Sequence, residues 1–257
     1  MPKLARRVIP LKDYNPTHRF PVITLLLIAA NVFVYFLVQR PNDPRQSQLR
    51  FNYEYATIPC EVTQGRPLTD VEIVRTLDAG DTESCGAGDG VEATEAFPRK
   101  QVYLSIIFSM FLHGSLLHLG GNMLFLWVFG NNVEDRMGVP GYIAFYLLSG
   151  VVGSVAHILV QPDSTIPMVG ASGAIAGVMG AYLVLFPNAR ILSLIVIVIR
   201  VIPAKWLLGF WFISQFFVNP AAGVAWLAHV GGFLFGVAVA LLLRDRLRPQ
   251  PAVTPLY

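Results

Sequence analysis

Long apolar runs constrain this chain more than any other feature of its sequence. Of its 257 residues, 54% are hydrophobic and only 14% are charged, which is unusual for a soluble domain. Several runs match the helix of roughly 20 residues that crosses ~30 Å of hydrocarbon. We therefore predict an all-α membrane protein with six transmembrane helices. Five spans are bounded by their apolar runs, Phe20–Gln39, Ser115–Val133, Pro140–Val160, Gly170–Pro187 and Gly223–Leu243.

The remaining span is harder to bound. Ile191–Val218 is too long for one perpendicular helix, and Pro203 with Lys205 interrupts it. We expect the span to begin near Pro203. The preceding stretch, Ile191–Ile202, is rich in Ile and Val and is expected to be an interfacial or lipid-contacting segment.

Basic residues at the ends of the spans indicate orientation. They precede the first span, follow the second and the last, and lie between the fourth and fifth, so both termini are predicted to be cytoplasmic. This divides the chain into a cytoplasmic segment 1–19, a six-helix domain 20–244 with a long extracytoplasmic loop 40–100 between helices 1 and 2, and a cytoplasmic tail 245–257. The lack of a transit peptide favours a bacterial plasma membrane. The net charge of +3 is explained by these flanking residues, so no nucleic-acid partner is expected.

The long loop contains both cysteines, Cys60 and Cys85. In an oxidising compartment a disulfide would restrain the loop by about 3 kcal/mol on the chain-entropy model. Two free thiols are the alternative, and the sequence leaves the choice open. After the loop, Gln101–Leu112 is apolar again and is expected to form a short interfacial helix.

Polar residues inside the apolar spans are costly in lipid and so indicate a site. Ser172 lies at the outer end of the fourth span, His229 near the outer end of the sixth, and His118 and Asn122 in the first turns of the second. All four can meet at one depth. His118 and Asn122 are four residues apart and share a helical face, which suits a pair of donors to an oxyanion. His229 is placed to accept the Ser172 proton, as in a serine nucleophile activated by a histidine.

Glycines on two of these spans allow the close approach that such a pair needs. Gly173 and Gly177 on the fourth span, and Gly232 and Gly236 on the sixth, each form a small-xxx-small face. Taken singly, each feature has a simpler explanation. A membrane-helix serine often bonds the preceding turn, and a lone histidine or GxxxG pattern is often only packing. The combination at matched depth favours a functional site.

These residues occur in ordered motifs that resemble the rhomboid family of intramembrane serine proteases. The motifs are His113-Gly-Ser-Leu-Leu-His118-Leu-Gly-Gly-Asn122, Glu134-Asp-Arg136-Met-Gly138, Gly170-Ala-Ser172-Gly173 and Ala228-His229-Val-Gly231-Gly232. The resemblance implies a six-transmembrane-helix rhomboid bundle. It also implies Ser172 as nucleophile, His229 as general base, and Asn122, His118 and the Ser172 amide as the oxyanion hole. Glu134 and Arg136 would form a structural ion pair, and His113 would be structural.

Two positions depart from the family pattern. Some members have a tyrosine four residues after the nucleophile that stacks on the histidine, whereas this chain has Ala176. The outer loop also lacks the Trp-Arg pair of many relatives. Because neither the fourth nor the sixth span contains a carboxylate, the sequence does not identify the group that orients His229.

The predicted function is intramembrane endopeptidase activity on transmembrane substrates near the outer membrane face. The expected partners are single-span membrane proteins and lipids, with no cofactor or metal; the oligomeric state and the natural substrate stay open. The alternative is a catalytically silent rhomboid-like chaperone or scaffold that binds transmembrane helices. A metal site or transporter built on His113, His118 and His229 is disfavoured, since the chain has no HExxH pair.

Overall fold

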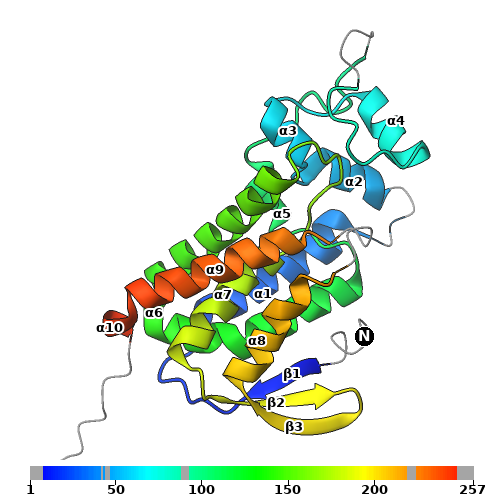
Figure 1. The fold of residues 1–257 in the computed structure, drawn as a ribbon. Coiled ribbons are helices and arrows are strands. Elements are labelled where there is room, and N and C mark those ends of the chain that lie inside the picture. The colour runs from blue at the N-terminus through cyan, green and yellow to red at the C-terminus, as the bar shows by residue number, and fades with distance from the viewer. Residues whose placement is uncertain (1–7, 42, 44–46, 88–92, 219–223, 248–257) are drawn as a thin grey trace, which may run out of the picture.

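The computed structural model describes residues 8–41, 43, 47–87, 93–218 and 224–247. It is an elongated helical bundle with a small helical unit at one end and a three-stranded sheet at the other (Figure 1). The bundle consists of α1 (Val22–Phe33), the π-helical η2 (Val34–Gln39), α6 (Leu116–Val160), α7 (Ser172–Leu185), α8 (Ala204–Gln215) and α9 (Trp226–Leu242). The short helix α10 (Arg244–Leu247) follows α9. Of the tail predicted over 245–257, residues 248–257 lie outside the described residues.

Two stretches of the described chain are long and apolar enough to cross a membrane. They are Val22–Gln39, which comprises α1 and η2, and Leu116–Val160, which is α6. Two further apolar helices, α7 and α9, are shorter than a full span. The fold is thus mostly helical with two candidate membrane helices, and the six-span arrangement stays a prediction.

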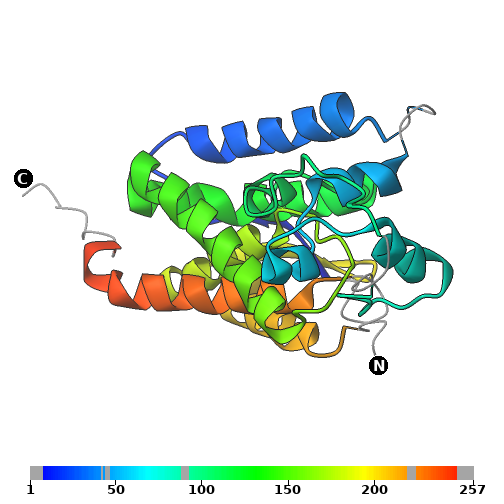
Figure 2. The same cartoon turned by 90° about the horizontal axis from the view of Figure 1, so that it is seen from above.

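A bend at Gly138 divides α6 into two arms (Figure 2). Its backbone is non-helical, with φ of 69° and ψ of 169°, a conformation open to glycine but strained for other residues. Pro140 follows at the start of the second arm, where its missing N–H costs little. The second and third predicted spans therefore correspond to the two arms of one assigned helix.

The centre of the bundle is α7, which packs closely against α9 and α6. A Cβ added to Gly232 would overlap the carbonyl oxygen of Gly173, and one added to Gly236 would overlap that of Gly177. The predicted glycine faces therefore do meet. With no side chains between them, the two backbones come into direct contact, which fixes the height of one helix against the other.

A three-stranded antiparallel sheet corrects the all-α prediction. Its order is β1 (Val8–Asp13), β2 (Arg190–Ile195) and β3 (Val198–Pro203). The segment expected to be interfacial, Ile191–Ile202, is this β2–β3 hairpin, because its β-branched side chains suit a pleated strand. The helix α8 begins directly after Pro203, as predicted.

The small helical unit, which we call the cap, comprises residues 47–87. It contains α2 (Gln48–Tyr55), α3 (Pro59–Gln64) and α4 (Asp70–Asp78). A Cys60–Cys85 disulfide joins α3 to the segment after α4, which resolves the choice left open by the sequence. Beyond the cap, the expected helix over Gln101–Leu112 is limited to α5 (Ser105–Ser109).

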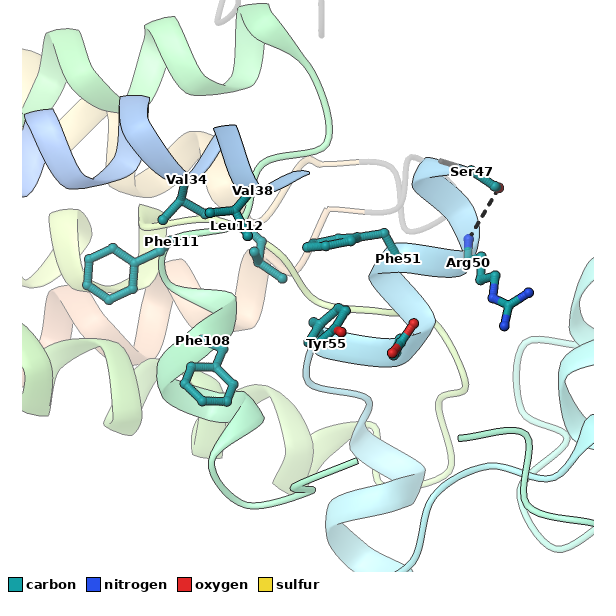
Figure 3. A pocket seen from close by; sticks show the side chains of 10 residues that line it. Val34, Val38, Ser47, Arg50, Phe51, Tyr55, Phe108, Phe111 and Leu112 are labelled. Carbon is teal, nitrogen blue, oxygen red and sulfur yellow. Dashed lines mark hydrogen bonds between the residues drawn. The ribbon is translucent and has the colours of Figure 1, made fainter. Parts of the chain in front are cut away.

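The cap is joined to the segment before α5 by a buried ion pair and borders an apolar groove. Glu61 forms an ion pair of 2.6 Å with Lys100, and both side chains are buried. The groove of about 750 Å³ lies between η2, α2 and α5 (Figure 3). Its walls include Val38, Phe51 and Phe108, and Arg50 lies at its rim (Figure 3).

Candidate active site

Ser172 and His229 lie within hydrogen-bonding distance of each other. Ser172 Oγ is 2.8 Å from His229 Nε2, although the two residues are 57 positions apart in the chain. Ser172 is the first residue of α7, and His229 lies in the first turn of α9. The glycine contacts between these two helices bring their N-terminal turns together. The geometry is that of a hydroxyl nucleophile beside a histidine base.

The turn before Ser172 has a conformation that requires glycine. Gly170 has φ of 126°, and a Cβ at this position would lie 2.8 Å from His118 Cε1 and 3.5 Å from Asn122 Nδ2. The side chains of His118 and Asn122 therefore converge on the backbone two residues before Ser172. The absence of a Cβ at Gly170 leaves a narrow space between this backbone and the two side chains.

Several donors around this space lack an internal partner. In the described part of the chain, Asn122 Nδ2 is buried and donates to no hydrogen-bond acceptor, so its N–H groups remain available. The backbone amides in the first turn of α7 have no intrahelical acceptor, and the helix dipole favours negative charge there. Donors of this kind are what an oxyanion hole requires, and the assignment of His118, Asn122 and the Ser172 amide to one stays a prediction.

The cap and α5 hold the loop that leads to Ser172. Gly170 N donates to Ser109 O at 2.9 Å, and Met168 N donates to Thr57 O at 2.7 Å. Further back, Cys60 N donates to Ser164 O at 3.0 Å. The backbone before the nucleophile is therefore fixed by the cap and α5 as well as by the bundle.

Gln215 is the site residue that the sequence did not predict. It is the last residue of α8, and its Oε1 lies 2.8 Å from His229 Nδ1. Trp211, one turn earlier on the same helix, lies against the His229 ring with centroids 5.9 Å apart. In the sequence Gln215 is a single glutamine near the end of an apolar run. Polar residues are common at span ends, so this position gave no specific signal.

Other polar residues singled out by the sequence have structural surroundings. His113 N donates to Gln39 Oε1 at 2.8 Å, and its ring packs edge-on to His118 with centroids 5.2 Å apart. The expected ion pair between Glu134 and Arg136 does not form. Glu134 instead accepts hydrogen bonds from the first-turn amides of α1, where a carboxylate complements the helix dipole.

Among the described residues, potential metal ligands gather in the cap. Among the residues that the structure describes, the group with ligand atoms within 4.8 Å of one another is Cys60, Glu72 and Cys85, in the cap. Because the two cysteines form a disulfide, they offer no thiolates. The histidines proposed for the metal alternative, His113, His118 and His229, do not form such a group in that part of the chain.

Comparison with known proteins identifies related sequences. The Rhomboid domain family matches residues 100–246. The chain is 36% identical to Rhomboid protein 1, mitochondrial, of Saccharomyces cerevisiae, over 57% of this chain and 44% of that protein. It is 28% identical to RHOMBOID-like protein 6, mitochondrial, of Arabidopsis thaliana, over 89% of this chain and 70% of that protein. It is 34% identical to Rhomboid protease GluP of Bacillus subtilis, over 51% of this chain and 24% of that protein.

These relatives correct the predicted location. A bacterial plasma membrane with cytoplasmic termini was expected, but the yeast and Arabidopsis relatives are named as mitochondrial, which contradicts that expectation. The reason is physical, since apolar spans and flanking charges report that a chain crosses hydrocarbon without identifying the membrane. The chain spans less than half the length of the yeast protein.

Proposed function

The chain belongs to the rhomboid family, and we propose that it is an intramembrane serine endopeptidase that hydrolyses transmembrane proteins through Ser172 and His229. One observation carries the proposal, the 2.8 Å contact between Ser172 Oγ and His229 Nε2. A silent scaffold has no need of such a contact. The Bacillus relative, named a protease, supports an enzymatic role, and the mitochondrial relatives favour a mitochondrial membrane.

In the proposed reaction His229 acts first as base and then as acid. Ser172 Oγ attacks the scissile carbonyl while its proton passes to His229 Nε2. The carbonyl oxygen becomes an oxyanion that accepts hydrogen bonds from His118, Asn122 and the Ser172 amide. His229 then gives the proton to the leaving amine. In the second half of the reaction His229 takes a proton from water, the water oxygen attacks the acyl carbonyl, and Ser172 Oγ leaves with the proton from His229.

The proposed architecture retains the six-span bundle predicted from the sequence. The two arms of α6 and the helices α7, α8 and α9 would join Val22–Gln39 as spans of a domain covering 20–244, with 1–19 and 245–257 flanking it. Ser172 and His229 then lie near the membrane face that carries the cap, so the scissile bond lies close to that surface. The proposed substrates are single-span membrane proteins whose helix unwinds easily around small residues.

The test uses purified protein in detergent or lipid discs with a model transmembrane substrate. Cleavage by wild type, abolished by Ser172→Ala and by His229→Ala, is the expected result. Labelling with a fluorophosphonate probe should follow the same pattern, because the probe reacts with an activated serine. Cleavage that persists in Ser172→Ala would contradict the assignment. Unlabelled, inactive wild type that still captures the substrate helix would favour the scaffold instead.

A further inference from the structure

Gln215 contacts the side of the His229 ring that faces away from the nucleophile. The imidazole lies between two oxygen atoms, Ser172 Oγ at 2.8 Å from Nε2 and Gln215 Oε1 at 2.8 Å from Nδ1. Gln215 is 6% exposed, so water does not compete freely for its carboxamide.

The other end of the carboxamide fixes which of its atoms faces the ring. Gln215 Nε2 donates to the Trp211 carbonyl at 3.0 Å and lies 3.3 Å from Ser214 Oγ. A backbone carbonyl can only accept a hydrogen bond, so the nitrogen of the carboxamide must point toward it. The oxygen, Oε1, is thereby left facing His229.

This direction determines the tautomer of the neutral imidazole. Because Oε1 can only accept, the proton of His229 must be on Nδ1. Nε2 then has a free lone pair and accepts the hydrogen bond from the Ser172 hydroxyl. This is the tautomer that a general base requires, whereas the opposite tautomer would present an N–H to Ser172.

The surroundings of the ring contain other histidines but leave this role to Gln215. His118 and His157, both on α6, are the titratable groups that interact with His229. Trp211, on the same helix as Gln215, packs against the His229 ring, and its ring centroid lies 6.0 Å from that of Phe233. One helix, α8, therefore supplies both the apolar wall and the hydrogen-bond acceptor.

From these contacts we infer that Gln215 is a positioning residue that selects the Nδ1-protonated tautomer of His229 and keeps its ring in line with Ser172. The inference rests on the proposed protease function. It implies that a neutral amide does the orienting that a carboxylate does in a serine triad.

The first test is spectroscopic and does not depend on catalysis. In wild type labelled with nitrogen-15 histidine, with His229→Ala used to assign the signals, His229 should show a protonated Nδ1 and an unprotonated Nε2. In Gln215→Met, which keeps the volume but removes the acceptor, the two tautomers should mix. An unchanged tautomer in Gln215→Met would overturn the inference even if the protein proves to have no protease activity.

The second test is kinetic. Gln215→Met should lower kcat on the model substrate by about 10- to 100-fold with little change in KM, the size of effect found when a supporting hydrogen bond is removed. Gln215→Glu should retain activity and move the acidic limb of the rate profile to higher pH, because a carboxylate stabilises the protonated ring. The matched control Ile213→Met, on the exposed side of α8, should match wild type.

The two proposals fail in different ways. If wild type does not cleave the substrate, or if Ser172→Ala cleaves it equally well, the proposed protease function is wrong. The tautomer measurement then decides the role of Gln215. Serine-dependent cleavage with an unchanged rate and pH profile in both Gln215 variants would overturn the positioning role alone. Comparing the thermal stability of Gln215→Met with that of Ile213→Met separates a loss of folding from a loss of orientation.

Discussion

The contact between α7 and α9 makes a measurable prediction about Gly232→Ala. The added methyl would overlap the carbonyl oxygen of Gly173, the residue next to the nucleophile. Carbon and oxygen atoms approach to about 3.3 Å at closest, so the two helices would have to separate by on the order of 1 Å. His229 is one turn before Gly232 on the same face and moves with it.

The separation should disrupt the dyad more than the fold. The distance between Ser172 Oγ and His229 Nε2 would grow from 2.8 Å to about 3.8 Å, beyond the ~3.2 Å limit of a good hydrogen bond. A misplacement of 1 Å costs about 100-fold in rate. Overpacking costs about 1–3 kcal/mol of stability. We expect fluorophosphonate labelling and substrate cleavage to fall about 100-fold in a protein that still folds.

Two further variants control for this result. Gly236→Ala would overlap the Gly177 carbonyl one turn deeper, so its effect on the dyad should be smaller, about 10-fold. Gly209→Ala adds the same methyl to α8, where nothing lies within 4 Å, and should behave as wild type. Wild-type labelling by a folded Gly232→Ala protein would refute the argument that backbone contact sets the distance between Ser172 and His229.

Three predictions concern the cap. Reducing the Cys60–Cys85 bridge releases a 25-residue loop and should destabilise the cap by about 3.5 kcal/mol on the chain-entropy model, seen as faster protease nicking; equal nicking would contradict this. Lys100→Met strands the buried Glu61 and should lower the free energy of unfolding by about 3–5 kcal/mol in denaturant titrations, with much of it recovered by adding Glu61→Gln. Burial alone would raise the pKa of Glu72, but hydrogen bonds from Arg66 and from the Thr69 and Gly86 amides lower it to about 2. Its stabilising effect is therefore present above pH 4.5 and lost as the pH falls toward 2, so the stability difference between wild type and Glu72→Gln should shrink over that range.

Features that depend on helical periodicity could be predicted from the sequence. Residues four apart in a helix lie on one face independently of tertiary contacts. This holds for His118 and Asn122 and for the glycine pairs on α7 and α9. Two glycine faces can then pack directly, which brings Ser172 beside His229. The start of α8 after Pro203 was predictable for the same local reason, because proline fits the beginning of a helix and disrupts its interior.

Features that depend on distant partners could not be predicted in this way. The strand β1 pairs with β2 far along the chain, and no local pattern in Val8–Asp13 identifies that partner. Glu134 and Arg136 are close enough in sequence to suggest an ion pair. In the fold, the first-turn amides of α1 donate to the Glu134 carboxylate instead. Gln215 belongs to this class, since its role depends on a ring that α9 supplies.

Both the bundle and the cap position Ser172, so the disulfide that closes the cap also affects the site. On the bundle side, α9 and α6 contact the backbone around Gly173. On the cap side, Met168 N donates to Thr57 O, and Thr76 Oγ1 lies 2.7 Å from Thr165 Oγ1. The segment before α3 and the helix α4 therefore hold the loop before Gly170. Loss of the disulfide would loosen α3 against α4. The loop before Gly170, which these helices hold, would then become more mobile than the bundle. The approach of His118 and Asn122 to the Gly170 backbone should therefore be more sensitive to reduction than the Ser172–His229 distance, because the backbones of α7 and α9 are in direct contact.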